Sequence, residues 1–169
     1  VEISSASAHY QSRTGRRRRK FMKISLSVIC TSLLPLALEL DWGPSNDKRQ
    51  AFELLDKTLS AAEEAGALPA KVYADAGYDA DWIHGVCREI WGVQSWIKPA
   101  CCRADGTMGG VHRGAMTPQR LKKQGYGQRW HVESFISGLK RVCGSTLGAR
   151  RERTQHHEAA FKVLAYALH

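Results

Sequence analysis

The stretch YGQRWHVESFISGLK, residues 126–140, carries the side chains of this chain best suited to phosphate chemistry. On an α-helix, four of them would gather within roughly 60° of one another. These four are Tyr126, Arg129, Glu133 and Lys140. A simple ion pair between Arg129 and Glu133 on a solvated helix is the plainest interpretation. However, residues 119–153 contain only two acids, Glu133 and Glu152, among many Lys and Arg, and a carboxylate in such surroundings favours a site for a divalent cation beside phosphate groups.

A second acidic residue, Asp75, directly follows a short stretch, residues 71–74, that we expect to form a strand. Ligand sites of open α/β sheets lie beyond the carboxyl ends of their strands. Magnesium prefers one or two carboxylates, with water and phosphate oxygens as its other ligands. We therefore predict that Asp75 and Glu133 share a divalent cation. Asp41 is a weaker candidate, because it lies in the turn-rich segment DWGPSND, where a turn or cap role is expected.

Strand and helix patterns alternate along the chain after an initial hairpin, which predicts a mixed α/β sheet flanked by helices. The apolar strands of the hairpin are residues 22–30 and 32–40, and a basic loop precedes them. Residues 98–117 are rich in Gly, Cys and Arg and have no clear period, so we interpret them as a loop or a disordered insertion. The other expected elements are a helix from near Asp47 that buries Phe52, Leu55, Leu59 and Ala62, a helix over 80–90, a strand over 93–97, the helix of Glu133, and a helix over 158–168 that buries Ala160, Phe161, Leu164 and Ala165.

The length of 169 residues, 43% of them hydrophobic, predicts a single domain over residues 1–169. A formal charge of +9 favours a polyanionic partner, most commonly nucleic acid. The densest basic cluster, for which we predict contacts with the DNA backbone, is Arg16, Arg17, Arg18 and Arg19. Trp130, next to Arg129, has a ring that can stack on a base, but we expect it to pack in the core.

The cysteines and the longest apolar run limit the cellular setting. Five cysteines without paired ligand spacing argue against a disulfide framework or a zinc site, and they favour a reducing cytoplasm. The apolar run over residues 24–40 is interrupted by polar residues and a proline, and it is shorter than the ~20 residues that cross a bilayer. We therefore expect no membrane partner.

The signature residues in the stretch 126–140 resemble those of a known family. Tyr126, Arg129, Glu133 and Lys140 match in type and spacing the Tyr-Arg-Glu-Lys signature of prokaryotic insertion-sequence transposases of the DDE type. The segment YADAGYDADWI is similar to the segment around their second catalytic aspartate, which gives that role to Asp75. YQSRTGRRRRKFMKISLSV and LELDWGPSNDKRQA are similar to the hairpin and the following helix of these enzymes, so the resemblance covers nearly the whole chain.

The resemblance implies a ribonuclease H-like fold in which an Asp, Asp and Glu triad binds two Mg²⁺ ions, or Mn²⁺ in their place. One ion would activate water or a 3′-hydroxyl, and the other would stabilise the leaving oxygen during DNA strand cleavage and transfer. Tyr126, Arg129 and Lys140 would hold DNA phosphates. The implied partners are the transposon ends and target DNA, bound by a homodimer in a synaptic complex in a prokaryotic cytoplasm, at the nucleoid.

One part of the family pattern has no counterpart in this chain. The first catalytic aspartate of the family belongs to an Asp-Ser/Thr-Thr/Ala-Gly segment that would lie immediately before Val1, and VEISSASAHYQSR is similar to its continuation. We therefore expect a C-terminal fragment that lacks the first aspartate and the first central strand, binds magnesium weakly and is inactive alone. Two alternatives stay open: a non-catalytic DNA-binding remnant, and an unrelated magnesium nuclease that shares the fold.

Overall fold

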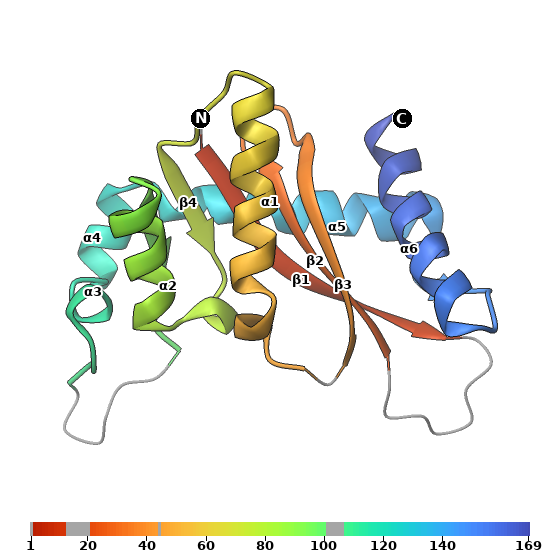
Figure 1. The fold of residues 1–169 in the computed structure, drawn as a ribbon, viewed down its shortest axis with the longest axis horizontal. Coiled ribbons are helices and arrows are strands. Elements are labelled where there is room, and N and C mark those ends of the chain that lie inside the picture. The colour runs from red at the N-terminus through yellow and green to blue at the C-terminus, as the bar shows by residue number, and fades with distance from the viewer. Residues whose placement is uncertain (1, 13–20, 44, 101–106) are drawn as a thin grey trace.

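The computed structural model describes residues 2–12, 21–43, 45–100 and 107–169, and of residues 7–12 it describes only the backbone. Its centre is a mixed sheet with the strand order β3-β2-β1-β4-β5 (Figure 1). The strands are β1 (Glu2–Ser12), β2 (Phe21–Ile29), β3 (Pro35–Gly43), β4 (Lys71–Ala74) and β5 (Gln94–Ile97), and the two-residue β6 (Thr146–Leu147) pairs with the far end of β1. The hairpin β2–β3 is antiparallel, whereas β4 runs parallel to both β1 and β5. The predicted mixed α/β class is confirmed.

Helices cover both faces of this sheet. The helix α1 lies on one face and α5 crosses the other (Figure 1). The helices are α1 (Ala51–Glu64), α2 (Asp81–Gly85), α3 (Val111–Gly114), α4 (Pro118–Lys123), α5 (Trp130–Cys143) and α6 (Glu152–Ala167). The 3₁₀ turns η1 (Asp47–Arg49), η2 (Ala76–Tyr78) and η4 (Tyr126–Arg129) precede α1, α2 and α5, and the π-helical segment η3 (Val86–Ile90) continues α2. None of the helices in the described ranges is long and apolar enough to span a membrane.

Residues 2–12 form the central strand of the sheet, so the expectation that a central strand is missing is wrong. β1 lies between β2 and β4, with Ile3 opposite Ile29 on one side and opposite Val72 on the other. Small side chains make this possible, because Ser4 and Ser5 are buried between the two helical layers. A Ser- and Ala-rich segment has weak strand propensity on its own, so only pairing with its neighbours identifies it as central.

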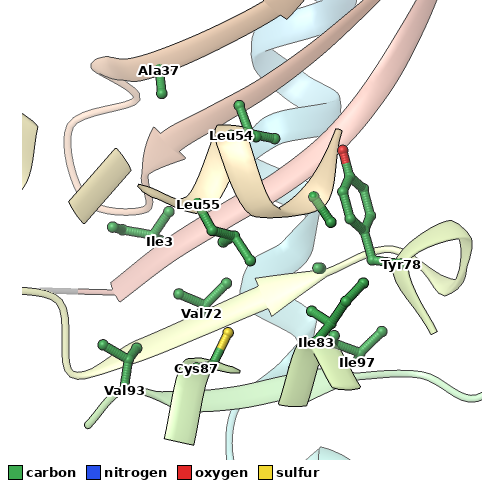
Figure 2. Close-up of a cluster of buried hydrophobic side chains, with 12 residues drawn as sticks. Ile3, Ala37, Leu54, Leu55, Val72, Tyr78, Ile83, Cys87, Val93 and Ile97 are labelled. Atoms are coloured by element: carbon green, nitrogen blue, oxygen red, sulfur yellow. The ribbon is translucent and has the colours of Figure 1, made fainter. Parts of the chain in front are cut away.

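The side of the sheet under α1 and α2 holds an apolar cluster, shown in Figure 2. Ile3 of β1 and Val72 of β4 lie against Leu55 of α1 there. The other side packs against α5 and α6 through a second cluster, made of Ala6, Met22, Ile24, Leu26, Val28, Val132, Phe135, Leu139, Leu147, Ala159 and Val163. The two clusters hold the strands between the two layers of helices, so both β4 and α5 have fixed positions relative to β1.

The predicted core face of α1 is confirmed for Leu55, Leu59 and Ala62 but not for Phe52, whereas α6 turns a different face to the core from the predicted one. Phe52 of α1 is half-exposed and contacts the ring of Trp91, and the buried positions of α1 are Ala51, Leu54, Leu55, Thr58 and Ala62. α6 begins at Glu152 and buries Gln155, Ala159 and Val163, whereas Phe161 and Leu164 are exposed. The pattern of apolar residues marked these helices correctly, but their neighbours decide which face is covered.

Within residues 98–117, which we expected to be a loop or a disordered insertion, Val111–Gly114 form the helical turn α3. The carboxylate of Asp81 accepts the backbone N–H groups of Val111, His112 and Arg113 at 2.9–3.2 Å. This carboxylate therefore joins α3 to the start of α2.

Candidate active site

Asp75 lies directly after β4, at the carboxyl end of this parallel strand. Its Oδ1 accepts the N–H of Ala76 at 2.7 Å and caps η2, and its own N–H donates to the carbonyl of Ser5 in β1 at 3.3 Å. Gly77 lies against the Asp47 carboxylate, so a side chain at this position would displace that carboxylate. Asp75 is thus held by backbone contacts while its side chain stays 48% exposed.

Glu133 lies in the first turn of α5, where the helix dipole favours a carboxylate. Arg129, at the end of η4, donates from Nη1 to Glu133 Oε1 at 2.5 Å, and the same nitrogen lies 3.8 Å from Asp75 Oδ1. Two carboxylates that are 58 positions apart in the sequence therefore converge on one cationic atom. We refer to these residues as the Asp75–Arg129–Glu133 cluster.

The cluster is open to solvent on its acidic side. The side chain of Glu133 is 54% exposed, whereas the side chain of Arg129 is 22% exposed. Burial alone would lower the pKa of Arg129, but its hydrogen bond to Glu133 and the nearby Tyr126 and Asp75 outweigh it, so this pKa is raised above its ordinary value. Arg129 is therefore a permanent cation, and the carboxylates beside it are accessible to a further ligand.

A family model described as a transposase DDE domain matches residues 3–168. This chain is a DDE transposase domain. No curated protein and no solved structure matches the chain. The family acts in DNA transposition and generally uses divalent metal ions. The mixed sheet with its flanking helices is consistent with a ribonuclease H-like DDE domain.

Tyr126 of this DDE domain contacts the end of β4. Its hydroxyl donates to the carbonyl of Ala74, the last residue of β4, at 3.0 Å, and its ring centre lies 5.9 Å from Cζ of Arg129. Burial raises the pKa of Tyr126, so the phenol stays protonated and remains a donor. A second bond joins β4 to the residues just before η4, since the hydroxyl of Tyr73 donates to the carbonyl of Gln124 at the end of α4 at 2.8 Å. The segment that carries Arg129 is therefore fixed to the end of the strand that carries Asp75.

The other residues predicted to bind DNA either lie away from the cluster or are not among the described residues. Lys140 lies on α5 seven residues after Glu133, about 10 Å further along the helix axis, and is partly buried. Arg16, Arg17, Arg18 and Arg19 lie outside the described residues. Trp130 is 53% exposed and stacks on His131 with ring centres 4.2 Å apart, so the expectation that it packs in the core is wrong. Its position at the first residue of α5 leaves the ring accessible, because the core side of this helix begins with Val132.

Oxygen ligands from two carboxylates fit a magnesium ion, which prefers such donors together with water and phosphate. The residues that would hold it in the DDE domain are Asp75 and Glu133. In the described part of the chain no three His, Cys, Asp or Glu side chains are arranged so that they could together hold a metal ion. Among the described residues, the cluster therefore offers a metal ion two carboxylates, Asp75 and Glu133, and no third one.

The central strand β1 has a small residue at the level where a third carboxylate would complete the cluster. Ser5 pairs with Ala74, so the next residue, Ala6, lies at the level of Asp75, and it faces the α5 side. The only acid of β1, Glu2, lies about 13 Å back along the strand and pairs with Lys71 at 3.6 Å. Asp41 lies on the edge strand β3 and accepts the N–H of Trp42 at 2.7 Å, as expected for a local structural role.

Proposed function

We propose that this chain is the catalytic domain of an insertion-sequence transposase of the Tyr-Arg-Glu-Lys group. In this proposal Asp75 and Glu133 hold Mg²⁺ for cleavage and transfer of DNA strands. The observation that carries it is the convergence of both carboxylates on Nη1 of Arg129, within 3.8 Å. Family membership supports DNA as the substrate, and the formal charge of +9 supports binding to its backbone.

The side chains divide the work of an in-line displacement at phosphorus. Bound Mg²⁺ would supply activation of the attacking oxygen and stabilisation of the leaving oxygen. Asp75 and Glu133 provide the negative charge that holds it, and Arg129 and Lys140 bind phosphate oxygens on either side of the scissile bond. Tyr126 holds Arg129 against β4. Trp130, exposed beside Arg129, provides a flat ring for stacking against a base.

Two carboxylates hold divalent cations less tightly than three, so we expect the chain to bind Mg²⁺ weakly and to cleave DNA slowly. Ala6→Asp would place a third carboxylate on β1 at the level of Asp75. We expect this variant to nick supercoiled DNA in the presence of Mn²⁺, and we expect Ala6→Asp/Glu133→Gln to lose that activity. Ala6→Asn, which has the same shape without the charge, is the matched control. A thermal melt of each variant checks that the buried substitution leaves the domain folded.

A non-catalytic DNA-binding remnant is the second candidate, favoured by the guanidinium that lies between the two carboxylates. A remnant would bind DNA identically with and without Mn²⁺, and Asp75→Asn or Glu133→Gln would leave the affinity unchanged. In both cases Arg129→Ala and Lys140→Ala should each lower the slope of log K against log salt by about one. If Ala6→Asp nicks DNA and this activity requires Glu133, the result favours the catalytic domain over the DNA-binding remnant.

A further inference from the structure

The guanidinium of Arg129 lies at the position that a cation shared by Asp75 and Glu133 would take. Its Nη1 is 2.5 Å from Glu133 Oε1 and 3.8 Å from Asp75 Oδ1. We propose that Arg129 and a divalent cation compete for these two carboxylates, so that metal binding releases the guanidinium toward a DNA phosphate. This inference rests on the proposed function, because it takes Asp75 and Glu133 as the metal-binding pair.

Competition follows from the charges and the donor atoms. Glu133 Oε1 already accepts the hydrogen bond of Arg129, so a dication that binds this oxygen from the side facing Asp75 would have to displace the guanidinium. A dication that contacts both carboxylates would also lie close to Nη1, where two positive charges repel each other strongly. The two carboxylates therefore bind Arg129 or the divalent cation more favourably than they bind both at the same time.

The surroundings of Arg129 allow it to leave. Both carboxylates are about half-exposed, and ion pairs in contact with water are weak. The ring of Tyr126, 5.9 Å from Cζ, lies on the β4 side of the guanidinium and is itself anchored to Ala74. An aromatic face attracts a guanidinium without fixing its hydrogen-bond partners, so it can hold Arg129 near the site after the carboxylates are lost.

The consequence is a coupling between metal and DNA. A guanidinium released from Glu133 and Asp75 has its donors available for bidentate binding of a phosphate. By thermodynamic linkage, the factor by which bound metal changes the affinity for DNA equals the factor by which bound DNA changes the affinity for metal. Arg129 thereby couples metal binding to DNA binding.

The test is a Mn²⁺ titration of the whole chain, followed by the electron paramagnetic resonance signal of free Mn²⁺. We expect Arg129→Gln to bind Mn²⁺ at least about fivefold more tightly than the unsubstituted chain, because a competing cation is removed. Arg141→Gln is the matched control, since it removes one positive charge from an exposed position of the same helix. It should change the affinity by less than about twofold. Equal or weaker Mn²⁺ binding by Arg129→Gln overturns the competition.

Glu133→Gln separates this inference from the proposed function. If no variant shows Mn²⁺ binding that depends on Glu133, the metal pair itself is wrong, and the proposed function fails with it. If Glu133-dependent binding is equally tight in the unsubstituted chain and in Arg129→Gln, the metal pair stands and only the competition fails. A second readout is the affinity for a duplex oligonucleotide at fixed ionic strength. Mn²⁺ should strengthen it in the unsubstituted chain, and this gain should be smaller in Arg129→Gln.

Discussion

Two arginines of this domain pair with aspartates, in surroundings that differ in burial and in the number of partners. Arg113 donates from Nε and Nη2 to the two oxygens of Asp79, both at 2.6 Å, and Asp79 is 1% exposed. Arg129 contacts one oxygen each of Asp75 and Glu133, and both of these carboxylates are about half-exposed. The buried Asp79–Arg113 pair balances one negative charge with one positive charge. Around Arg129, two carboxylates share one guanidinium, which leaves a net negative charge that solvent can reach.

This difference separates an ion pair that holds the fold from one suited to binding. Asp79 also accepts the N–H of Ala100 at 2.9 Å. Burial would raise the pKa of Asp79, but its bonds from Arg113 and Ala100 outweigh that effect and lower it. No solvent is needed to satisfy that carboxylate, so the Asp79–Arg113 pair anchors the segment that contains α3. The cluster around Arg129 keeps oxygens facing solvent and is the one that a ligand can enter.

The largest effect on stability is expected where the buried pair is broken. Asp79→Asn leaves the Arg113 guanidinium without its counter-charge, which typically costs about 3–5 kcal/mol. Urea denaturation should show this loss in the free energy of unfolding. If Asp79→Asn and Glu133→Gln lower stability by the same amount, the distinction between the two ion pairs is wrong.

A pH titration should show a second large effect in the same buried region. His84 is fully buried, and its Nδ1 lies 2.8 Å from the Ser95 hydroxyl. Burial, followed by the charges of Arg88 and His112, lowers the pKa of His84 from 6.5 to about 4. Between these values the unfolded chain binds more protons than the folded one, so stability falls as the pH falls from 7 to 4. The expected loss is about 3 kcal/mol.

Denaturant melts at several pH values measure that loss, and His84→Asn isolates it from the titration of carboxylates. Asn keeps a polar group near Ser95 but does not titrate. The variant should be less stable at pH 7 and show a shallower decline between pH 6.5 and 4. An unchanged slope would contradict the assignment of this pH dependence to His84.

A smaller effect is expected at the contact that fixes Arg129 to β4. Tyr126→Phe removes the bond to the Ala74 carbonyl, and a hydrogen bond of this kind contributes about 1 kcal/mol. If Tyr126 positions Arg129 in this way, the variant should lose stability and also weaken DNA binding several-fold. Full stability combined with weaker DNA binding would indicate a direct phosphate contact instead.

The smallest change in stability is expected at Glu133. Its exposed bond to Arg129 across one helical turn contributes about 0.3–0.5 kcal/mol, so Glu133→Gln should melt almost as the unsubstituted chain does. The same variant should lose Mn²⁺ binding. A loss of more than about 1 kcal/mol would mean that Glu133 supports the fold, contrary to its assignment to the open cluster.

The strands after β1 and the helix of Glu133 could be predicted because their apolar patterns are local. The meeting of Asp75 with Glu133 was predictable from two rules, the strand-end position of ligand sites and the family signature. Phe161 and Leu164 were assigned to the wrong side of α6, since local periodicity does not specify which face its neighbours cover. The central place of β1 depends on pairing with two distant strands, which its Ser-rich sequence does not indicate.

The contact of Arg129 with both carboxylates was beyond sequence reasoning for a similar reason. The spacing of four residues predicted its pairing with Glu133, but not the approach of Asp75 from β4. The hydroxyl of Tyr126 likewise donates to the backbone of Ala74, which belongs to a strand 52 residues earlier. Contacts of this range are fixed by the packing of η4 on β4, which no local pattern contains.

The most direct test of the central claim is an anomalous difference map from crystals of this domain soaked in Mn²⁺. The account predicts a peak bonded to carboxylate oxygens of both Asp75 and Glu133, with the guanidinium of Arg129 displaced from Glu133. Carboxylates that point apart, or a peak bonded to neither of them, would contradict it.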